Sequence, residues 1–144
     1  MKKFLFLMAI CGLMVACGGN EKASGPKVAK TTVEGCYEIP AQDLKWTTDT
    51  EYSASTDRPK AIVNLKLNVA CIAEPETNSD LYLDLVDKDG FVILEMFAKS
   101  SLPSVGQKAQ VEFKGVERGK YAHEIDETLK QVASAQFRLV PSKY

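Results

Sequence analysis

The sequence predicts a mainly β fold, an antiparallel sandwich with one short helix, and three features of the chain support this. Apolar residues occupy every second position between residues 61 and 72, the period of a strand with one face on a core. Two apolar runs flank Asp87-Lys88-Asp89-Gly90, which is typical of a β-hairpin turn. Residues 121–135 instead show the three- and four-residue spacing of an amphipathic helix.

The N-terminus has the layout of a secretory signal. Lys2 and Lys3 precede an apolar run that ends at Ala16, which matches the charged and hydrophobic regions of a leader. The run is shorter than the ~20 apolar residues that a bilayer-spanning helix needs. We therefore expect residues 1–16 to be a signal peptide.

The end of this leader resembles a lipoprotein signal. Met14-Val15-Ala16-Cys17 is similar to the lipobox of bacterial lipoproteins. The resemblance implies cleavage before Cys17 and acylation of Cys17, and two or more acyl chains anchor a protein stably to a membrane. Gly18 stands where that family has an Asp for inner-membrane retention. This implies the outer membrane, with a periplasm-facing domain favoured over a surface-exposed one.

A polar segment follows the predicted lipid site. Residues 17–32 are small and polar, with Val28 as the single large aliphatic residue. A segment of this composition buries too little apolar surface to order itself, so we expect a flexible tether. The folded part is expected to be a single domain over residues 33–144, a length that supports one core.

Alternating apolar and polar residues predict the strands of this domain. The expected strands span residues 33–39, 44–48, 61–72, 81–86, 91–96, 110–116 and 136–140. Acidic residues lie early in the expected helix and Lys130 lies late, as the helix dipole prefers. Together these elements predict an immunoglobulin-like sandwich of about six or seven strands with one short helix near residues 121–135.

Part of this region resembles a known module. Leu85-Val86-Asp87-Lys88-Asp89-Gly90, followed by Leu102-Pro103, Gly106-Gln107 and Phe113, is similar to the FxLYD-type immunoglobulin-like modules of secreted bacterial proteins. In those modules a strand enters an Asp-Gly hairpin. The resemblance implies a sandwich and no catalytic residue.

Two cysteines remain beyond the leader and the lipid site. An even number in an exported chain makes Cys36 and Cys71 candidates for a disulfide. The strand phases disagree, because Cys71 falls on an apolar face and Cys36 shares a face with acidic residues. A bulge at Gly35 would bring the two into phase. Free thiols are the alternative.

An aromatic pair offers a candidate ligand contact. Trp46, the only tryptophan, precedes a polar loop that contains Tyr52. If exposed, the two rings could stack on a sugar or contact a partner protein. A tryptophan in the core of the sandwich is the interpretation that we favour.

The sequence predicts no catalytic residue, no metal site and no cofactor. His123 is the only histidine, so a cluster of histidine ligands is excluded. No Gly-x-Ser-x-Gly sequence accompanies it, and we expect a solvated helix residue, with a lone general base as the alternative. Asp87 and Asp89 fit two positions of a calcium loop, but Leu85 and Met96 occupy positions that require carboxylates.

Composition limits the partners. The net charge is −1, and without a basic stripe a nucleic-acid partner is not expected. No polybasic segment for anionic lipids is evident, so the expected membrane contact is the lipid on Cys17. We expect a non-catalytic binding or structural module whose partner is another envelope protein or a glycan. A hydrolase that uses His123 is the remaining alternative.

Overall fold

The computed structural model describes residues 23–52 and 58–142. The predicted signal peptide, Cys17 and residues 18–22 of the predicted tether lie outside this part of the chain. The described elements are β1 (Ala23–Val28), β2 (Thr31–Val33), β3 (Tyr37–Ile39), β4 (Gln42–Tyr52), β5 (Pro59–Cys71), β6 (Ser79–Val86), β7 (Val92–Ala98), β8 (Lys108–Arg118), α2 (Ala122–Leu129) and β9 (Ser134–Pro141).

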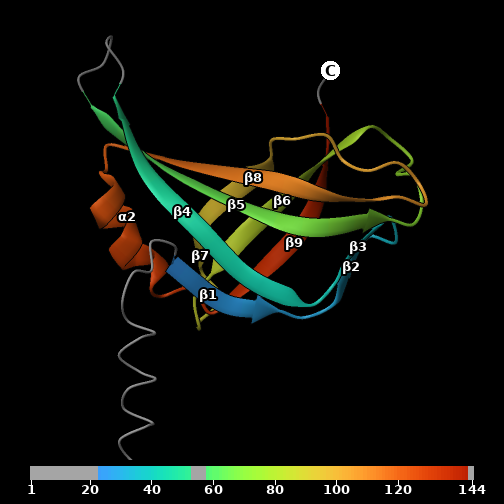
Figure 1. Cartoon of the computed structure of the whole chain (residues 1–144), viewed down its shortest axis with the longest axis horizontal. Helices are drawn as coiled ribbons and strands as arrows, with labels where there is room; N and C mark the ends of the chain where they lie inside the picture. The colour runs from blue at the N-terminus through green and yellow to red at the C-terminus, as the bar shows by residue number, and fades with distance from the viewer. Residues whose placement is uncertain (1–22, 53–57, 143–144) are drawn as a thin grey trace, which may run out of the picture.

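The strands of the described residues form one antiparallel sheet. Their order is β1-β4-β5-β8-β7-β6-β9, and the short β2–β3 hairpin joins through β3 to the edge of β5 that β4 also uses. The sheet curls into a half-barrel, so that β6, β7 and β9 face β4, β5 and β8 across the interior (Figure 1). The predicted mainly β, antiparallel, sandwich-like fold with one short helix is therefore confirmed, with the two facing layers belonging to one continuous sheet.

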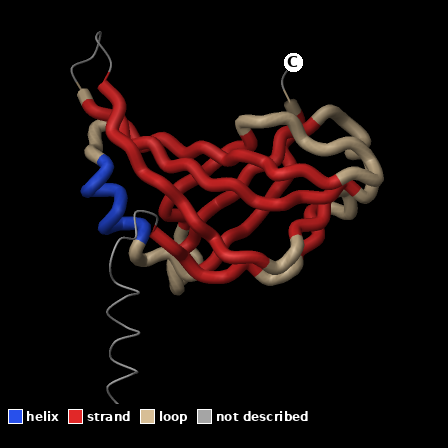
Figure 2. The backbone as a smooth tube through the Cα atoms, viewed as in Figure 1, coloured by secondary structure: helices blue, strands red, loops and turns tan. Residues whose placement is uncertain are grey.

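The core fills the inside of this curl. The alternate residues of β5 that were predicted to face a core, from Ala61 to Cys71, are all buried. They meet apolar residues from the opposite half of the sheet, including Leu81, Leu83, Leu85, Leu94 and Met96. Helix α2 covers one end of the curl (Figure 2), where its Ile125 and Leu129 complete the same core. Because apolar and polar residues alternate in the sequence, each long strand thus has one face on the core and one face on the outside.

The folded region begins earlier than predicted. Residues 23–28, expected to belong to a flexible tether, form β1 and pair with β4, and residues 31–33 form β2. The backbone of β1 pairs with β4, and Val28 is buried, at 5% exposure. Gly25 lies directly against the Trp46 ring, where no side chain would fit. A polar segment can therefore be an ordered edge strand when its neighbour supplies the pairing.

The predicted strand over residues 33–39 is instead a hairpin. Glu34 and Gly35 both have positive φ, at 46° and 72°, and Cys36 N donates to Val33 O at 2.9 Å. This is the conformation of a type I′ turn, which reverses the chain between β2 and β3. Gly35 therefore lies in a turn and does not form the predicted bulge.

The structure also tests the predicted turn at residues 87–90 and the predicted end of the helix. At the β6–β7 hairpin, Asp87 Oδ1 accepts the N–H groups of Asp89 and Phe91, and Gly90 has φ 89°, so the predicted turn is confirmed. The helix ends at Leu129, six residues before the predicted end. Ala133 N already donates to Val86 O and β9 begins at Ser134, because pairing with β6 replaces further helical turns. In the described residues, no helix has the length and apolarity to cross a membrane.

Candidate ligand-binding groove

A groove crosses the outer face of the half-barrel, over β4, β5 and β8. It encloses about 510 Å³ and is lined by Lys45, Thr47, Asn64, Leu65, Lys66, Lys99, Gln110 and Glu112. A volume of this size is within the range of small-molecule and cofactor pockets, roughly 300–1,000 Å³.

The pleat of the sheet explains which side chains reach the groove. On β5, the buried residues Val63, Leu65 and Leu67 alternate with Asn64 and Lys66. Register then sets the neighbours: Asn64 pairs with Thr47 on β4, and Lys66 pairs with Glu112 on β8. On the outer face of β4, β5 and β8, polar side chains of neighbouring strands therefore lie side by side.

The segment after β7 forms one side of the groove. β7 pairs with β8 only at Phe97 and Ala98, and the chain then stays beside β8 through two further hydrogen bonds. Lys99 N donates to Glu112 O at 2.7 Å, and Glu112 N donates to Ser100 Oγ at 2.9 Å. These bonds hold Lys99 next to the face of β8.

The groove carries an excess of positive charge. Among the described residues, its only carboxylate is that of Glu112, which lies 3.6 Å from Lys99 Nζ. Lys45 and Lys66 form no ion pair with any residue in the described ranges. Two ammonium groups therefore remain uncompensated at this site, beside two side-chain amides and one hydroxyl that can donate hydrogen bonds to a ligand.

A second concave region lies near the end of β5. Two depressions of about 350 and 490 Å³ share Tyr37, Asn78, Ser79 and Pro103. Burial, followed by the nearby Cys71, Cys36 and Glu74, raises the pKa of Tyr37 above its usual value of 10.0. A nucleophilic cysteine needs a neighbouring cation or a helix N-terminus. Among the described residues, the surroundings of Cys71 include the phenol of Tyr37 and the carboxyl group of Glu74.

Both cysteines are unbonded in the structure, Cys36 in the β2–β3 turn and Cys71 at the end of β5. Tyr37, the residue after Cys36, pairs with Cys71, and Cys36 O accepts hydrogen bonds from Ile72 N and Ala73 N. Each thiol points to a carbonyl oxygen of its own segment, at 3.5 Å in both cases. A disulfide between Cys36 and Cys71 stays a prediction.

The favoured interpretation of Trp46 as a core residue is confirmed, and the alternative of a ligand contact through its ring is wrong. Its side chain is only 3% exposed and belongs to the core, so it cannot stack on a ligand at the surface. Its Nε1 has no hydrogen-bond partner among the described residues. The Trp46 ring is buried because it lies against Gly25 of β1, where the absence of a side chain leaves space for the large indole.

Tyr52 is exposed, in an aromatic cluster that the sequence did not predict. Its ring is 66% exposed and meets Tyr121 edge-on at 6.3 Å between centroids. Tyr121 in turn stacks on His123 at 5.6 Å. His123 thus lies exposed in the first turn of α2, against an aromatic ring. The described residues hold no group of three or more potential metal ligands.

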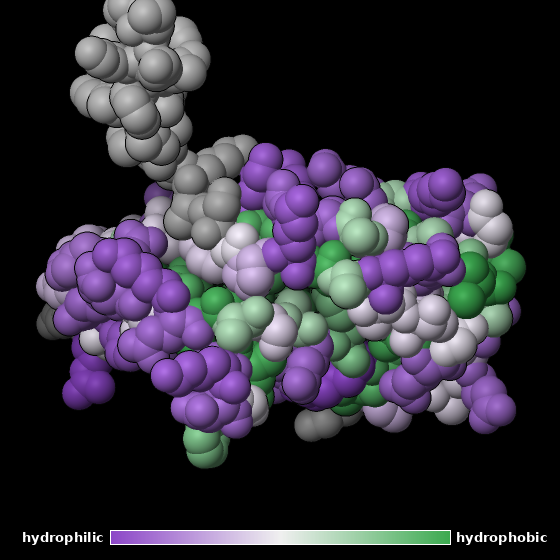
Figure 3. Space-filling view, turned by 90° about the horizontal axis from the view of Figure 1, so that it is seen from below, coloured by the Kyte–Doolittle hydropathy of each residue, from purple (hydrophilic) through white to green (hydrophobic). Residues whose placement is uncertain are grey.

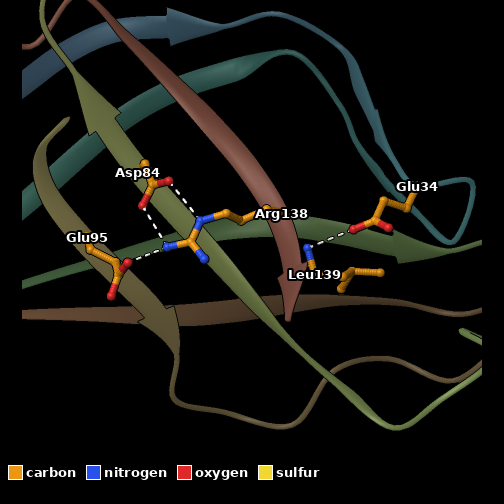
Figure 4. A network of polar contacts seen from close by, with 5 residues as sticks. All are labelled: Glu34, Asp84, Glu95, Arg138 and Leu139. Carbon is orange, nitrogen blue, oxygen red and sulfur yellow. Dashed lines mark hydrogen bonds and ion pairs between the residues drawn. The ribbon is translucent and has the colours of Figure 1, made fainter. Parts of the chain in front are cut away.

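The opposite outer face carries an ion network (Figure 4). Arg138 on β9 donates to Asp84 on β6 at 2.9 and 3.3 Å and also to Glu95 on β7, while its guanidinium lies over the Tyr82 ring at 4.8 Å. The hydrogen bond to Asp84 raises the pKa of Arg138. Since every charge here has a partner, this cluster ties three strands together and leaves no free group for a ligand.

Comparison of the chain with known protein families, curated proteins and solved structures finds no match.

Proposed function

We propose that this protein is a lipid-anchored envelope module that binds a ligand and carries out no reaction. The binding role is supported by the groove over β4, β5 and β8. There the uncompensated ammonium groups of Lys45 and Lys66 lie on the outer face of the sheet. β5 pairs along its length with β8 and on its other edge with β4 and β3. Side chains on such a rigid support are held in place for recognition.

The anchor in this proposal is a lipid on Cys17. It is supported by the charged and apolar leader and by the resemblance of Met14-Val15-Ala16-Cys17 to a lipobox. The outer membrane, with a periplasm-facing domain, is the location that Gly18 favours within that resemblance.

Substitution of the proposed lipid site tests the anchor. We expect Cys17→Ser to move the protein from the membrane fraction to the soluble fraction, because no acyl chain can be attached. Cys11→Ser is the matched control, since Cys11 lies inside the leader and its loss should leave the protein in the membrane fraction. A Cys17→Ser protein that stays with the membrane would contradict the lipoprotein proposal.

Filling the groove tests the binding role. The full mature protein in detergent would be mixed with native envelope extract, and the bound material compared for wild type and Asn64→Tyr. Asn68→Tyr is the matched control, because Asn68 lies on the same strand and face but does not line the groove. We expect Asn64→Tyr alone to lose bound material. Identical material on all three proteins would argue against the groove.

An aromatic binding surface is a second candidate, favoured by the exposed cluster of Tyr52, Tyr121 and His123. It replaces the predicted pair of Trp46 and Tyr52. Loss of envelope binding in a Tyr52→Ser, Tyr121→Ser variant, with binding retained in Asn64→Tyr, would favour this surface. We propose no catalytic role for His123, because no acid within the described residues hydrogen-bonds to its ring to orient it as a base.

A further inference from the structure

We propose that the groove recognises an acidic oligosaccharide, a chain of sugars with carboxylate or sulfate groups. This inference rests on the proposed binding function and names the class of ligand. It is carried by two observations, the arrangement of charge in the groove and the amide and hydroxyl side chains that line the rest of it.

The two uncompensated lysines lie close together on neighbouring strands. Trp46 pairs with Leu65, so Lys45 and Lys66 follow at adjacent positions on β4 and β5, and both are exposed. Like charges side by side on a sheet repel and lower its stability. An anion bound between them would remove that repulsion, whereas a neutral ligand would not.

The remaining lining favours hydroxyl groups as the other part of the ligand. Asn64 and Gln110 offer amides that both donate and accept, and Thr47 offers a hydroxyl. A free inorganic anion would occupy only a small part of about 510 Å³. Repeated acidic groups among many hydroxyls, as in an acidic oligosaccharide, match lysines interspersed with amides along one groove.

A peptide is a poorer match to the same surface. Extended peptides usually add to a free sheet edge through main-chain hydrogen bonds, or insert apolar side chains into pockets. In the groove the β5 backbone between Asn64 and Lys66 already pairs with β8, and β4 pairs with β5 as far as Trp46. Leu65 is the only apolar residue of the lining and it is 2% exposed.

Binding measurements with matched ligands test the ligand class. Full-length mature protein in detergent would be titrated with short polygalacturonate, alginate and chondroitin sulfate chains. Fully methyl-esterified polygalacturonate is the uncharged control, and poly-glutamate is the acidic peptide control. We expect at least one acidic sugar to bind, with affinity that falls as salt rises, and neither control to bind comparably.

Substitution of the lysines tests the site. We expect Lys45→Gln and Lys66→Gln each to weaken binding of the acidic sugar about fivefold, and the double variant about 20-fold or more. Lys30→Gln is the control, because Lys30 is exposed and does not line the groove, and the affinity of this variant should equal that of wild type. Circular dichroism checks that each variant is folded.

Three results would overturn the inference. They are equal binding of the methyl-esterified chain, equal or tighter binding of poly-glutamate, and no binding of any acidic sugar. If Asn64→Tyr loses envelope material while no acidic sugar binds, the groove is a binding site for another class and only this inference fails. If Asn64→Tyr keeps all envelope material as well, the proposed function fails too.

Discussion

Glu34 combines an unusual backbone conformation with a long-range contact. It is the one non-glycine residue in the described ranges with positive φ, a conformation that costs a residue with a Cβ about 1 kcal/mol. Its carboxylate accepts a hydrogen bond from Leu139 N at 3.1 Å, across 105 positions of sequence. The strain in the turn therefore places an acceptor at the free edge of β9 (Figure 4).

Substitutions of Glu34 separate the cost of its positive φ from the contribution of its hydrogen bond to Leu139 N. We expect Glu34→Ala to lower the free energy of unfolding by about 1 kcal/mol, since the strain stays and the acceptor is lost. Glu34→Gln keeps an acceptor oxygen and should lose less. Amide hydrogen exchange followed by NMR is the decisive measurement, because exchange at Leu139 should accelerate in Glu34→Ala. Unchanged exchange there would show that the contact contributes nothing.

Tyr37 links stability to alkaline pH. Burial is the main cause that raises its pKa above 10.0, so the folded protein holds the phenol proton more tightly than the unfolded chain does. This stabilisation is complete below pH 10 and is lost as pH rises through the higher pKa of the folded state. We expect the unfolding free energy to fall above about pH 10 and Tyr37→Phe to reduce this fall. Denaturant titrations at several pH values measure it, and an identical slope in Tyr37→Phe would refute the link.

At the scale of elements, the outer face of β6, β7 and β9 depends on one guanidinium. Asp84 is 8% exposed, and Arg138 provides its ion pair. Since a nearly buried carboxylate without a partner is costly, Arg138→Met should lower the unfolding free energy by about 2 kcal/mol. Arg138 is itself partly exposed, which keeps the expected loss below that of a fully buried pair.

A double variant and a surface control make this prediction specific. Asp84→Asn together with Arg138→Met should recover part of the loss, because no buried unpaired charge remains and the Glu95 side chain is 57% exposed. Lys130→Met removes an ion pair with Glu127 whose side chains are both about 70% exposed, and its stability should not change measurably. Equal losses in Arg138→Met and Lys130→Met would contradict the role of burial.

Local sequence patterns predicted the elements that local forces determine. The alternation from Ala61 to Cys71 predicted β5 and its inner face, and Asp87 with Gly90 predicted the β6–β7 turn, because pleat and turn chemistry act over a few residues. β1 was not predicted because its order comes from pairing with β4, whose partner residues lie 14 to 23 positions later in the chain. The β2–β3 turn was not predicted because glutamate, the residue at position 34, is unfavourable at positive φ.

The groove was not predictable from single strands. Lys45 and Lys66 each look like an ordinary lysine on the solvent face of a strand, 21 positions apart in the chain. Only cross-strand register makes them neighbours, and the net charge of −1 conceals the local excess. The one available signal was the polar face of residues 62–72, which carries Asn64, Lys66 and Asn68 together.

At the scale of the whole molecule, the sheet curls so that its two edge strands approach each other without forming a pair. β1 and β9 end the strand order and do not pair with each other, and the side chain of Glu34 spans from the β2–β3 turn to β9. Figure 3 views the molecule from below Figure 1, the side where β1 lies, and shows hydrophobic side chains between hydrophilic ones across this face. Apolar side chains therefore reach the surface on this face.

The early start of β1 also limits how high the domain can stand above a membrane. Ala23 comes six residues after Cys17, and six residues span at most about 22 Å in any conformation. β4, with 11 residues, is longer, at roughly 36 Å. In the proposed anchored state, the start of β1 thus stays within about 22 Å of the acylated residue, and the groove residue Lys45, which pairs with Ser24 of β1, belongs to the part of the domain nearest the anchor.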